Sequence, residues 1–494
     1  MRRAFFLTLL AAVATVAAAQ STPDLPDIGT PADATIAQSD EYRIGAMILR
    51  QLRDQNQLLE DPEVDEYLQG VGSRLVAQAP DGSQRFTFFA VRDPGLNAFA
   101  LPGGFIGVNY GLILATRNES ELASVLAHEI AHVTQRHIAR AVRAQGRQSL
   151  ASMAAVLAAI LIGAATGAGG DAMTGAIAVA QGAAAQQQIN FTRSNEYEAD
   201  RVGIGFLAAA GFEPRAMPDF FDTMGRRTGL GTSQIPEFLQ THPVSSNRIA
   251  ESRSRATQFE RRRVTDSASY LLARERLRAL SAPRDAQQRG PAVTADAGSG
   301  TEAGALEVRY GEALKLLGNG QPAAAAEILS GLIERHADIT LLYSALGQAQ
   351  MAAGFESDAM ATFEQAIGLF PRNVPLSVRY AEALMAADRP KQAHSLLLDV
   401  FNNVPPTPAQ IRLTALAASA AGDTGDAYYY MSEYHIASGD LPLAAQQLEL
   451  ALAAPNLTPV QRERFRARLT EVREYLLSDR RQRRTATTNG ERDR

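Results

Sequence analysis

The spacing of apolar positions divides the chain into two halves with different predicted secondary structure. Between residues 39 and 282 the pattern is mixed: residues 85–91 are rich in the aromatic side chains that favour strands, and longer stretches have apolar residues at helical spacing. Residues 283–304 are polar, aperiodic and rich in Gly, Pro and Ala, which predicts an interdomain linker. Helical spacing continues to residue 477, and the Arg-rich residues 478–494 are typical of a disordered tail.

The second half contains an internal repeat of 34 residues. Residues that recur in one phase of this repeat are Gly320, Gly354 and Asp388; Ala325, Ala359 and Ala393; and Leu329, Phe363 and Leu397. A turn residue and a small residue that both recur every 34 residues are the signature of the tetratricopeptide repeat. Each such repeat is a pair of helices. We expect about four pairs, stacked so that they form a concave protein-binding surface.

The N-terminal segment has the three parts of a secretory signal peptide. Two arginines follow Met1, an uncharged apolar run extends to Val16, and small residues lead to an expected cleavage after Ala19. We therefore expect residues 1–19 to direct export to the periplasm and residues 20–38 to form a linker. The paired arginines leave twin-arginine export open as an alternative.

Composition and charge exclude several kinds of chemistry. The 494 residues contain no Cys, so any bound metal must use His, Asp or Glu. The formal net charge of −5 would not gather a polyanion, and we expect no nucleic-acid partner.

Residues 148–170 and 172–192 are uncharged but dominated by Ala and Gly, which favours a helical hairpin with peripheral membrane contact over a membrane span. The arginines between residues 253 and 278 are expected on the solvated face of a helix.

One predicted helix carries the motif His-Glu-x-x-His, at His128, Glu129 and His132. Asn118 is a suitable N-cap with Glu121 three residues later, and the apolar residues that follow have helical spacing. Two histidines one turn apart can share a zinc ion, and the glutamate beside them can take a proton from a water molecule that the metal polarises. The motif predicts a zinc peptidase; two structural histidines on a core helix are the alternative.

A catalytic zinc needs a third protein ligand. His137 falls off the ligand face of the predicted helix and is expected on the surface. In the absence of Cys, a carboxylate is the economical choice. A second predicted helix, within residues 190–211, carries Glu196 and Asp200 one turn apart on one face, whereas Glu198 points elsewhere.

These motifs resemble those of the gluzincin metallopeptidase family that includes the CAAX prenyl protease and the heat-shock membrane proteases. The resemblance covers about residues 40–250 and rests on His128-Glu129-x-x-His132, Glu196-x-x-x-Asp200, residues 97–104 upstream, and Thr241-His242-Pro243 with Arg248 downstream. A signal peptide combined with C-terminal tetratricopeptide repeats is similar to the periplasmic branch of that family.

The resemblance implies one zinc ion per chain on His128, His132 and Glu196, with Glu129 as the general base. The implied reaction is hydrolysis of a peptide bond without a covalent intermediate. The substrates that the resemblance implies are unfolded or misassembled outer-membrane proteins.

Three further residues receive roles from the same resemblance. Asp200 would hold a ligand histidine, which such partners commonly do in metal sites. His242 and Arg248 would approach the metal from a loop, where a cation could steady the oxyanion or the histidine could occupy the open metal position. A plain loop histidine is the alternative for His242.

Residues 97–110 combine a Pro-Gly-Gly turn with the strand-like residues 105–108. We expect this short strand to lie beside the site and to offer an edge that binds extended substrate by strand addition. A structural hairpin without a substrate role is the alternative.

The predicted fold class is α+β: a mostly helical zinc metallopeptidase domain with a small sheet at residues 39–282, followed by an all-α tetratricopeptide solenoid at residues 305–477. The predicted function is a periplasmic zinc endopeptidase whose repeats dock the client or an outer-membrane assembly complex. A chaperone or scaffold with a latent zinc site is the first alternative. A membrane-embedded prenyl-protein protease is disfavoured, because only one weak segment could span a membrane.

Overall fold

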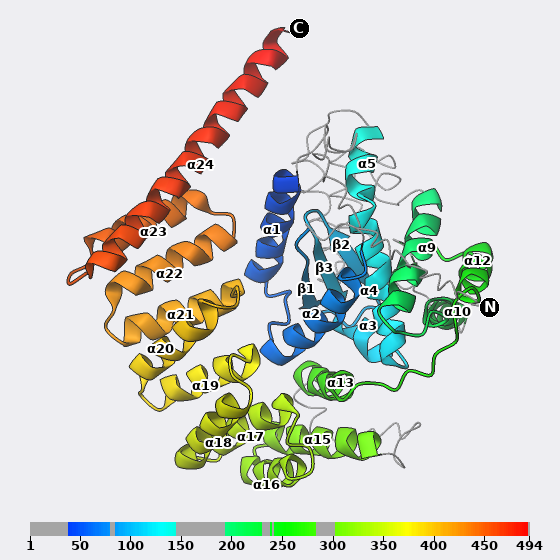
Figure 1. Cartoon of the computed structure of the whole chain (residues 1–494), viewed down its shortest axis with the longest axis horizontal. Helices are drawn as coiled ribbons and strands as arrows, with labels where there is room; N and C mark the ends of the chain where they lie inside the picture. The colour runs from blue at the N-terminus through cyan, green and yellow to red at the C-terminus, as the bar shows by residue number, and fades with distance from the viewer. Residues whose placement is uncertain are drawn as a thin grey trace, which may run out of the picture.

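The computed structural model of the chain describes residues 38–79, 84–144, 193–229, 238–239, 242–282 and 302–492. The predicted signal peptide, the N-terminal linker at residues 20–37, the Ala/Gly-rich residues 148–192 and linker residues 283–301 lie outside the described residues. Within the described part, the first half combines helices with a small sheet and the second half is helical, which confirms the predicted fold class (Figure 1).

The first half surrounds its sheet with helices. Its elements, in chain order, are α1 (Gln38–Asp54), α2 (Pro62–Val76), β1 (Thr87–Val91), β2 (Ala98–Leu101), β3 (Phe105–Asn109), α3 (Tyr110–Ala115), α4 (Glu119–Thr134), α5 (His137–Ala144), α9 (Arg193–Ala209), α10 (Ala216–Gly229), α12 (Ser246–Ala256) and α13 (Ala268–Ser281).

The sheet has the order β1-β3-β2, with β1 parallel and β2 antiparallel to β3. Both predicted strands form, but the expectation that residues 105–108 offer a free edge is wrong, because β3 is the central strand. The reason is the turn before it: Gly103 and Gly104 have φ angles of 80° and 86°, which folds β2 back onto β3 as a hairpin. Among the described strands, β2 therefore forms the edge next to β3.

Helix α4 is buried along nearly its whole length, and α9 packs across it. The side chain of Asn118 accepts a hydrogen bond from the Glu121 backbone N–H, which confirms the predicted cap. Apolar residues of both helices share one core with α2, the sheet and α10. A Cβ added at Gly203 would lie 3.1 Å from the carbonyl oxygen of Ala127, so this glycine allows α9 to approach α4 closely.

The second half is a stack of helix pairs. Its elements are α15 (Glu302–Gly318), α16 (Pro322–Ile333), α17 (Thr340–Ala352), α18 (Glu356–Leu369), α19 (Val374–Ala386), α20 (Pro390–Phe401), α21 (Pro408–Ala420), α22 (Thr424–Ala437), α23 (Leu441–Ala453) and α24 (Pro459–Arg492). These helices form an arc, and α1 and α2 lie on its inner side (Figure 1).

The 34-residue period is visible in the backbone. Gly320, Gly354, Asp388 and Gly422 each end the first helix of a pair with a positive φ angle, between 56° and 84°. The small residues in phase with them, Ala325, Ala359 and Ala393, are fully buried where helices cross. The predicted disordered tail differs from the structure, because α24 continues as helix to Arg492. Residues 478–492 contain no Pro and one Gly, so little in them would end a helix.

Helix α13 joins the two halves. Tyr270 and Leu277 belong to the core of the first half, whereas Leu272 belongs to the core of the first repeats. The expectation of one solvated arginine-rich helix is wrong: residues 253–278 include the end of α12, an irregular segment and most of α13. Arg276 is only 5% exposed, because α13 is buried between the two cores.

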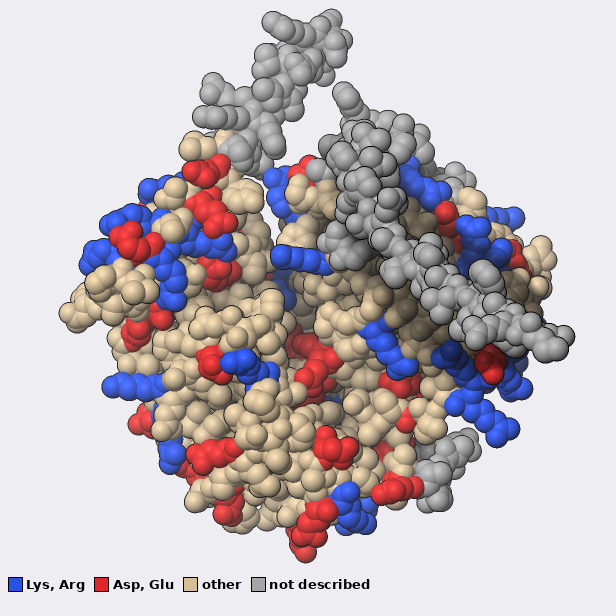
Figure 2. Space-filling view, viewed as in Figure 1, with Lys and Arg blue, Asp and Glu red and all other residues tan. Residues whose placement is uncertain are grey.

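Charges of both signs are interspersed over the visible face, and acidic side chains gather where the two halves meet (Figure 2). At the same junction Arg276 donates to Asp61 from two guanidinium nitrogens at 2.7 and 2.8 Å, and Arg379 of α19 donates to Glu63 at 2.8 Å. Arg50 of α1 also contacts Asp440 at 3.2 Å, so the repeats touch the first half at two separated places. No helix of the described part combines the length and the apolar character needed to cross a membrane.

Candidate metal centre

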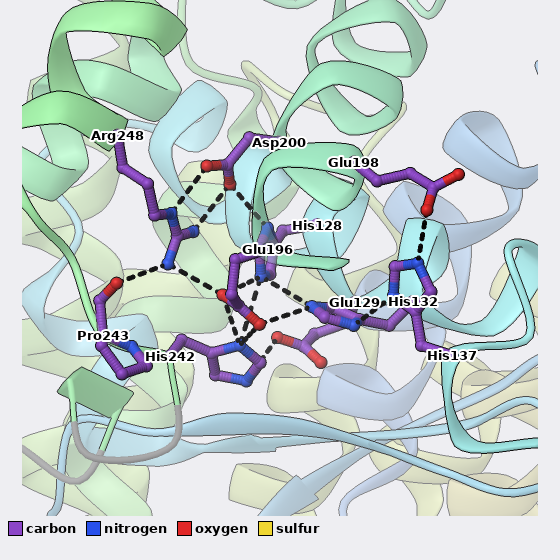
Figure 3. A network of polar contacts seen from close by, with 10 residues as sticks. All are labelled: His128, Glu129, His132, His137, Glu196, Glu198, Asp200, His242, Pro243 and Arg248. Atoms are coloured by element: carbon purple, nitrogen blue, oxygen red, sulfur yellow. Dashed lines mark hydrogen bonds and ion pairs between the residues drawn. The ribbon is translucent and has the colours of Figure 1, made fainter. Parts of the chain in front are cut away.

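Four buried side chains from three parts of the fold meet in one cluster. His128 and His132 lie one turn apart on α4, Glu196 comes from the first turn of α9, and His242 comes from the segment before α12. One potential ligand atom from each lies within 4.8 Å of the others (Figure 3). The structure thus brings together residues that are more than 100 positions apart in the sequence.

The separations between these atoms fit a single metal ion. His128 Nε2 lies 3.0 Å from His132 Nε2 and 3.3 Å from His242 Nδ1, and the two Glu196 oxygens lie 3.4 and 3.5 Å from the His132 and His128 nitrogens. Ligands placed tetrahedrally at about 2.1 Å from a zinc ion are about 3.4 Å apart. Both the types of donor and their spacing are therefore suitable for zinc.

Glu129 lies beside this cluster, in a position that suits a general base. It is 1% exposed, and its Oε1 atom has no hydrogen-bond partner among the described residues. That atom is 3.5 Å from His242 Nε2, and the carboxylate also accepts a backbone hydrogen bond from Ala100 of β2. Burial raises the pKa of Glu129. A buried carboxylate oxygen that accepts no hydrogen bond and lies next to the donor set can take a proton from water.

Asp200 and Arg248 support the cluster from behind. Asp200 Oδ1 lies 2.9 Å from His128 Nδ1, the nitrogen on the far side of the ring from the other donors. Arg248 donates to both oxygens of Asp200 at 2.8 Å, to Glu196 at 2.8 Å and to the Pro243 carbonyl at 3.0 Å. With its guanidinium engaged in this way, Arg248 is placed to hold the two carboxylates rather than to meet an oxyanion.

His242 lies in the segment before α12 and is held against Phe238. Its backbone N–H donates to the Phe238 carbonyl at 2.7 Å, and its ring stacks on the Phe238 ring with centroids 5.0 Å apart. Nδ1 faces Glu196 at 3.2 Å, whereas Nε2 faces Glu129. The imidazole therefore fills the corner that the other three side chains leave in the donor set.

Burial and neighbouring charges shift the pKa values of His128, His132 and Glu196 in different directions. Burial disfavours the charge of His128, but Asp200 and Glu196 outweigh this effect and raise its pKa to about 10. Burial and the neighbouring His128 lower the pKa of His132 far below its usual value. Despite burial, the pKa of Glu196 is well below its usual value because His242, His128 and His132 favour the carboxylate. Glu196 is thus an anion ready to face a cation.

The expectation that His137 lies on the surface is wrong, since its side chain is fully buried. Its Nδ1 lies 2.8 Å from His132 Nδ1, and its Nε2 lies 3.3 Å from Glu198 Oε2. Helical projection fails here because α4 ends at Thr134 and Arg136 has a φ angle of 53°, which turns the chain before α5 begins. Burial lowers the pKa of His137 to about 4. Sequence reasoning missed this residue because the turn at Arg136 has no signal in the sequence.

Comparisons with known proteins agree with this geometry. The model of peptidase family M48 matches residues 62–256, and a tetratricopeptide repeat model matches residues 350–417. A relative from Vibrio cholerae serotype O1 is 35% identical over 483 residues, which cover 96% of this chain and 98% of the relative. A relative from Escherichia coli (strain K12), named beta-barrel assembly-enhancing protease, is 31% identical over 92% of both chains.

A more distant match covers about a third of the chain. The mitochondrial metalloendopeptidase OMA1 of Arabidopsis thaliana is 30% identical over 158 residues, which are 32% of this chain and 29% of that protein. The matches over nearly the full length are the ones that decide the classification. The chain belongs to peptidase family M48 and is a metalloprotease that carries tetratricopeptide repeats.

Proposed function

We propose that this protein is a zinc endopeptidase in which His128, His132 and Glu196 hold one zinc ion and Glu129 is the general base. The observation that carries the proposal is the donor cluster beside a buried Glu129 oxygen that has no hydrogen-bond partner among the described residues. When bound, zinc supplies a Lewis acid that polarises the peptide carbonyl and lowers the pKa of water toward about 7.

The protein side of the reaction follows from the positions of its own residues. Glu129 takes a proton from the attacking water and passes it to the leaving amine. Asp200 orients His128, and Arg248 holds Asp200 and Glu196 in place, so that the donors are arranged before substrate arrives.

The outer edge of β2 is the proposed substrate-binding strand. The backbone of Ala100 in β2 contacts Glu129, so this strand runs directly past the general base. An extended peptide that adds to this edge would be held by backbone hydrogen bonds, which favours unfolded chains over any particular sequence.

Two observations support the proposed location and substrates of this protein. Residues 1–19 have the pattern of a signal peptide, and full-length relatives carry the name beta-barrel assembly-enhancing protease. We place the protein in the periplasm, where it would cleave unfolded or misassembled outer-membrane proteins. The repeats would dock the client or an outer-membrane assembly complex.

A second candidate function is favoured by the position of His242. Because its imidazole fills the remaining corner of the donor set, the site is closed to substrate until this side chain moves. A protein with a largely latent site would act as a chaperone or scaffold in outer-membrane protein assembly.

Proteolysis of a urea-unfolded outer-membrane β-barrel by the purified protein separates the two candidates. The endopeptidase account predicts cleavage of the unfolded barrel, no cleavage of the folded barrel, and loss of cleavage with a chelator or with Glu129→Gln. If the wild type leaves the unfolded barrel intact while wild type and Glu129→Gln suppress its aggregation equally, the chaperone function is supported instead.

A further inference from the structure

His132 is backed by a row of polar contacts that the reaction described above does not use. His132 Nδ1 lies 2.8 Å from Nδ1 of His137, at the start of α5. His137 Nε2 lies 3.3 Å from Glu198 Oε2 on α9 (Figure 3). Arg140 Nη1 of α5 donates to the same oxygen at 2.9 Å. Three elements, α4, α5 and α9, are thus joined behind one histidine of the motif.

The chemistry of these groups fixes the direction of each hydrogen bond. An ionised carboxylate only accepts, so the hydrogen between Glu198 and His137 must be on His137 Nε2. A neutral His137 then presents a lone pair at Nδ1, so the hydrogen between the two rings is on His132 Nδ1. His132 Nε2 is left with its lone pair directed at His128 and Glu196.

We infer that His137 and Glu198 are positioning residues that lock His132 in the tautomer and ring orientation needed to bind metal through Nε2. The inference rests on the proposed function, because it takes His132 as a metal ligand. A hydrogen bond to the second nitrogen of a ligand histidine is a general way in which metal sites fix that ligand.

The arrangement around the other motif histidine supports this inference. His128 is backed directly by Asp200, whose carboxylate is held by Arg248. His132 is backed by Glu198, whose carboxylate is held by Arg140, with the His137 ring placed between them. Each motif histidine is therefore oriented by a carboxylate–arginine pair.

The backbone also favours a specific role for His137. Arg136, directly before it, has a φ angle of 53°, in the left-handed region that non-glycine residues rarely occupy. Because of this turn the His137 ring faces His132 rather than solvent. Backbone strain of this kind persists where the surrounding structure requires it.

The test compares His137→Phe, which keeps a ring but removes the acceptor, with His137→Gln, which supplies a new acceptor. His336→Phe in the repeats is the matched control. We expect His137→Phe to weaken zinc binding by about 10–100-fold, measured by competition with a chelator, and His137→Gln to restore most of the affinity. In the metal-free protein labelled with ¹⁵N-histidine, His132 should show one Nδ1–H tautomer in the wild type and a mixture in His137→Phe.

Wild-type zinc affinity and an unchanged His132 tautomer in His137→Phe would overturn the inference. If that variant does not fold, Glu198→Ala replaces it, with the same tautomer mixture expected and a single tautomer as the contrary result. His132→Ala separates this inference from the proposed function. Full zinc binding by His132→Ala would refute the ligand assignment itself, whereas zinc loss in His132→Ala with no effect of His137→Phe would refute only the positioning role.

Discussion

Glu196 and Asp200, one turn apart on α9, contact opposite nitrogens of the same imidazole ring. Glu196 Oε2 lies 3.5 Å from His128 Nε2, and Asp200 Oδ1 lies 2.9 Å from His128 Nδ1. One helix thus supplies a candidate metal ligand and the group that orients another ligand. The close packing of α9 on α4 at Gly203 makes this double contact possible.

Removal of the Asp200 carboxylate should weaken metal binding. Without it, His128 loses the partner at Nδ1, and the Arg248 guanidinium loses two of its acceptors. We expect Asp200→Ala to lower zinc affinity by about 10–100-fold in a chelator competition assay. The partly exposed Glu251 on α12 offers the control Glu251→Ala, and equal zinc affinity of the two variants would exclude the orienting role.

Replacement of His242 should open the site. The ring occupies one corner of the donor set, so His242→Ala leaves His128, His132 and Glu196 while it frees that corner for water and substrate. We expect zinc content to stay constant and the rate of proteolysis to rise several-fold. Lower activity at constant zinc content would instead assign His242 to the transition state, and no change in either quantity would exclude both roles.

Several features could be predicted from the sequence because they depend on local patterns. The motif helix, its Asn118 cap and the facing pair Glu196 and Asp200 follow from helical spacing within one segment. The helix pairs could be predicted from the 34-residue period of the sequence. Asp388 supports this, because it adopts a positive φ angle like the glycines that lie at 34-residue intervals from it.

Other features depend on tertiary structure and leave no local pattern. His137 became part of the site because one residue, Arg136, adopts a left-handed backbone that helical projection does not foresee. Arg276 is buried because it pairs with the carboxylate of Asp61 and the repeats cover both side chains. Asp61 lies 215 positions away in the sequence, so no local pattern indicates this pairing. The central position of β3 in the sheet likewise depends on its pairing with β1, which is not its neighbour in the sequence.

The junction between the halves should depend on its buried ion cluster. Arg379 of α19 donates to Glu63 and Asp61 at 2.8 and 2.9 Å, and Glu63 is almost fully buried. Loss of one partner leaves an uncompensated buried charge, which typically costs about 3–5 kcal/mol. We expect Arg379→Met to lower the free energy of unfolding in urea by this order.

The exposed pair of Arg309 and Glu312 provides the control for that experiment. Arg309→Met should cost no more than about 1 kcal/mol, because exposed ion pairs contribute little. Equal effects of the two substitutions would show that the buried cluster does not hold the halves together.

Stability should fall as pH rises through the range in which Glu41 ionises. Burial on α1 raises the pKa of Glu41 from 4.5 to about 7, although Arg136 donates to its carboxylate at 3.2 Å. The folded protein therefore binds more protons than the unfolded chain between these values. A raised carboxylate pKa therefore makes the free energy of unfolding decrease from pH 4.5 to pH 7, by about 3 kcal/mol at most. Glu41→Gln should flatten this part of the curve, and parallel curves for variant and wild type would contradict the assignment.

The most direct test of the zinc endopeptidase assignment pairs metal analysis with a protease assay on wild type, Glu129→Gln and Glu196→Gln. The account predicts that the wild type holds about one zinc per chain, cleaves an unfolded protein, loses this activity with a chelator and regains it with zinc. Glu129→Gln should keep the zinc but lose cleavage, whereas Glu196→Gln should lose most of the zinc. Cleavage by zinc-free wild type, or wild-type activity in Glu129→Gln, would contradict the account.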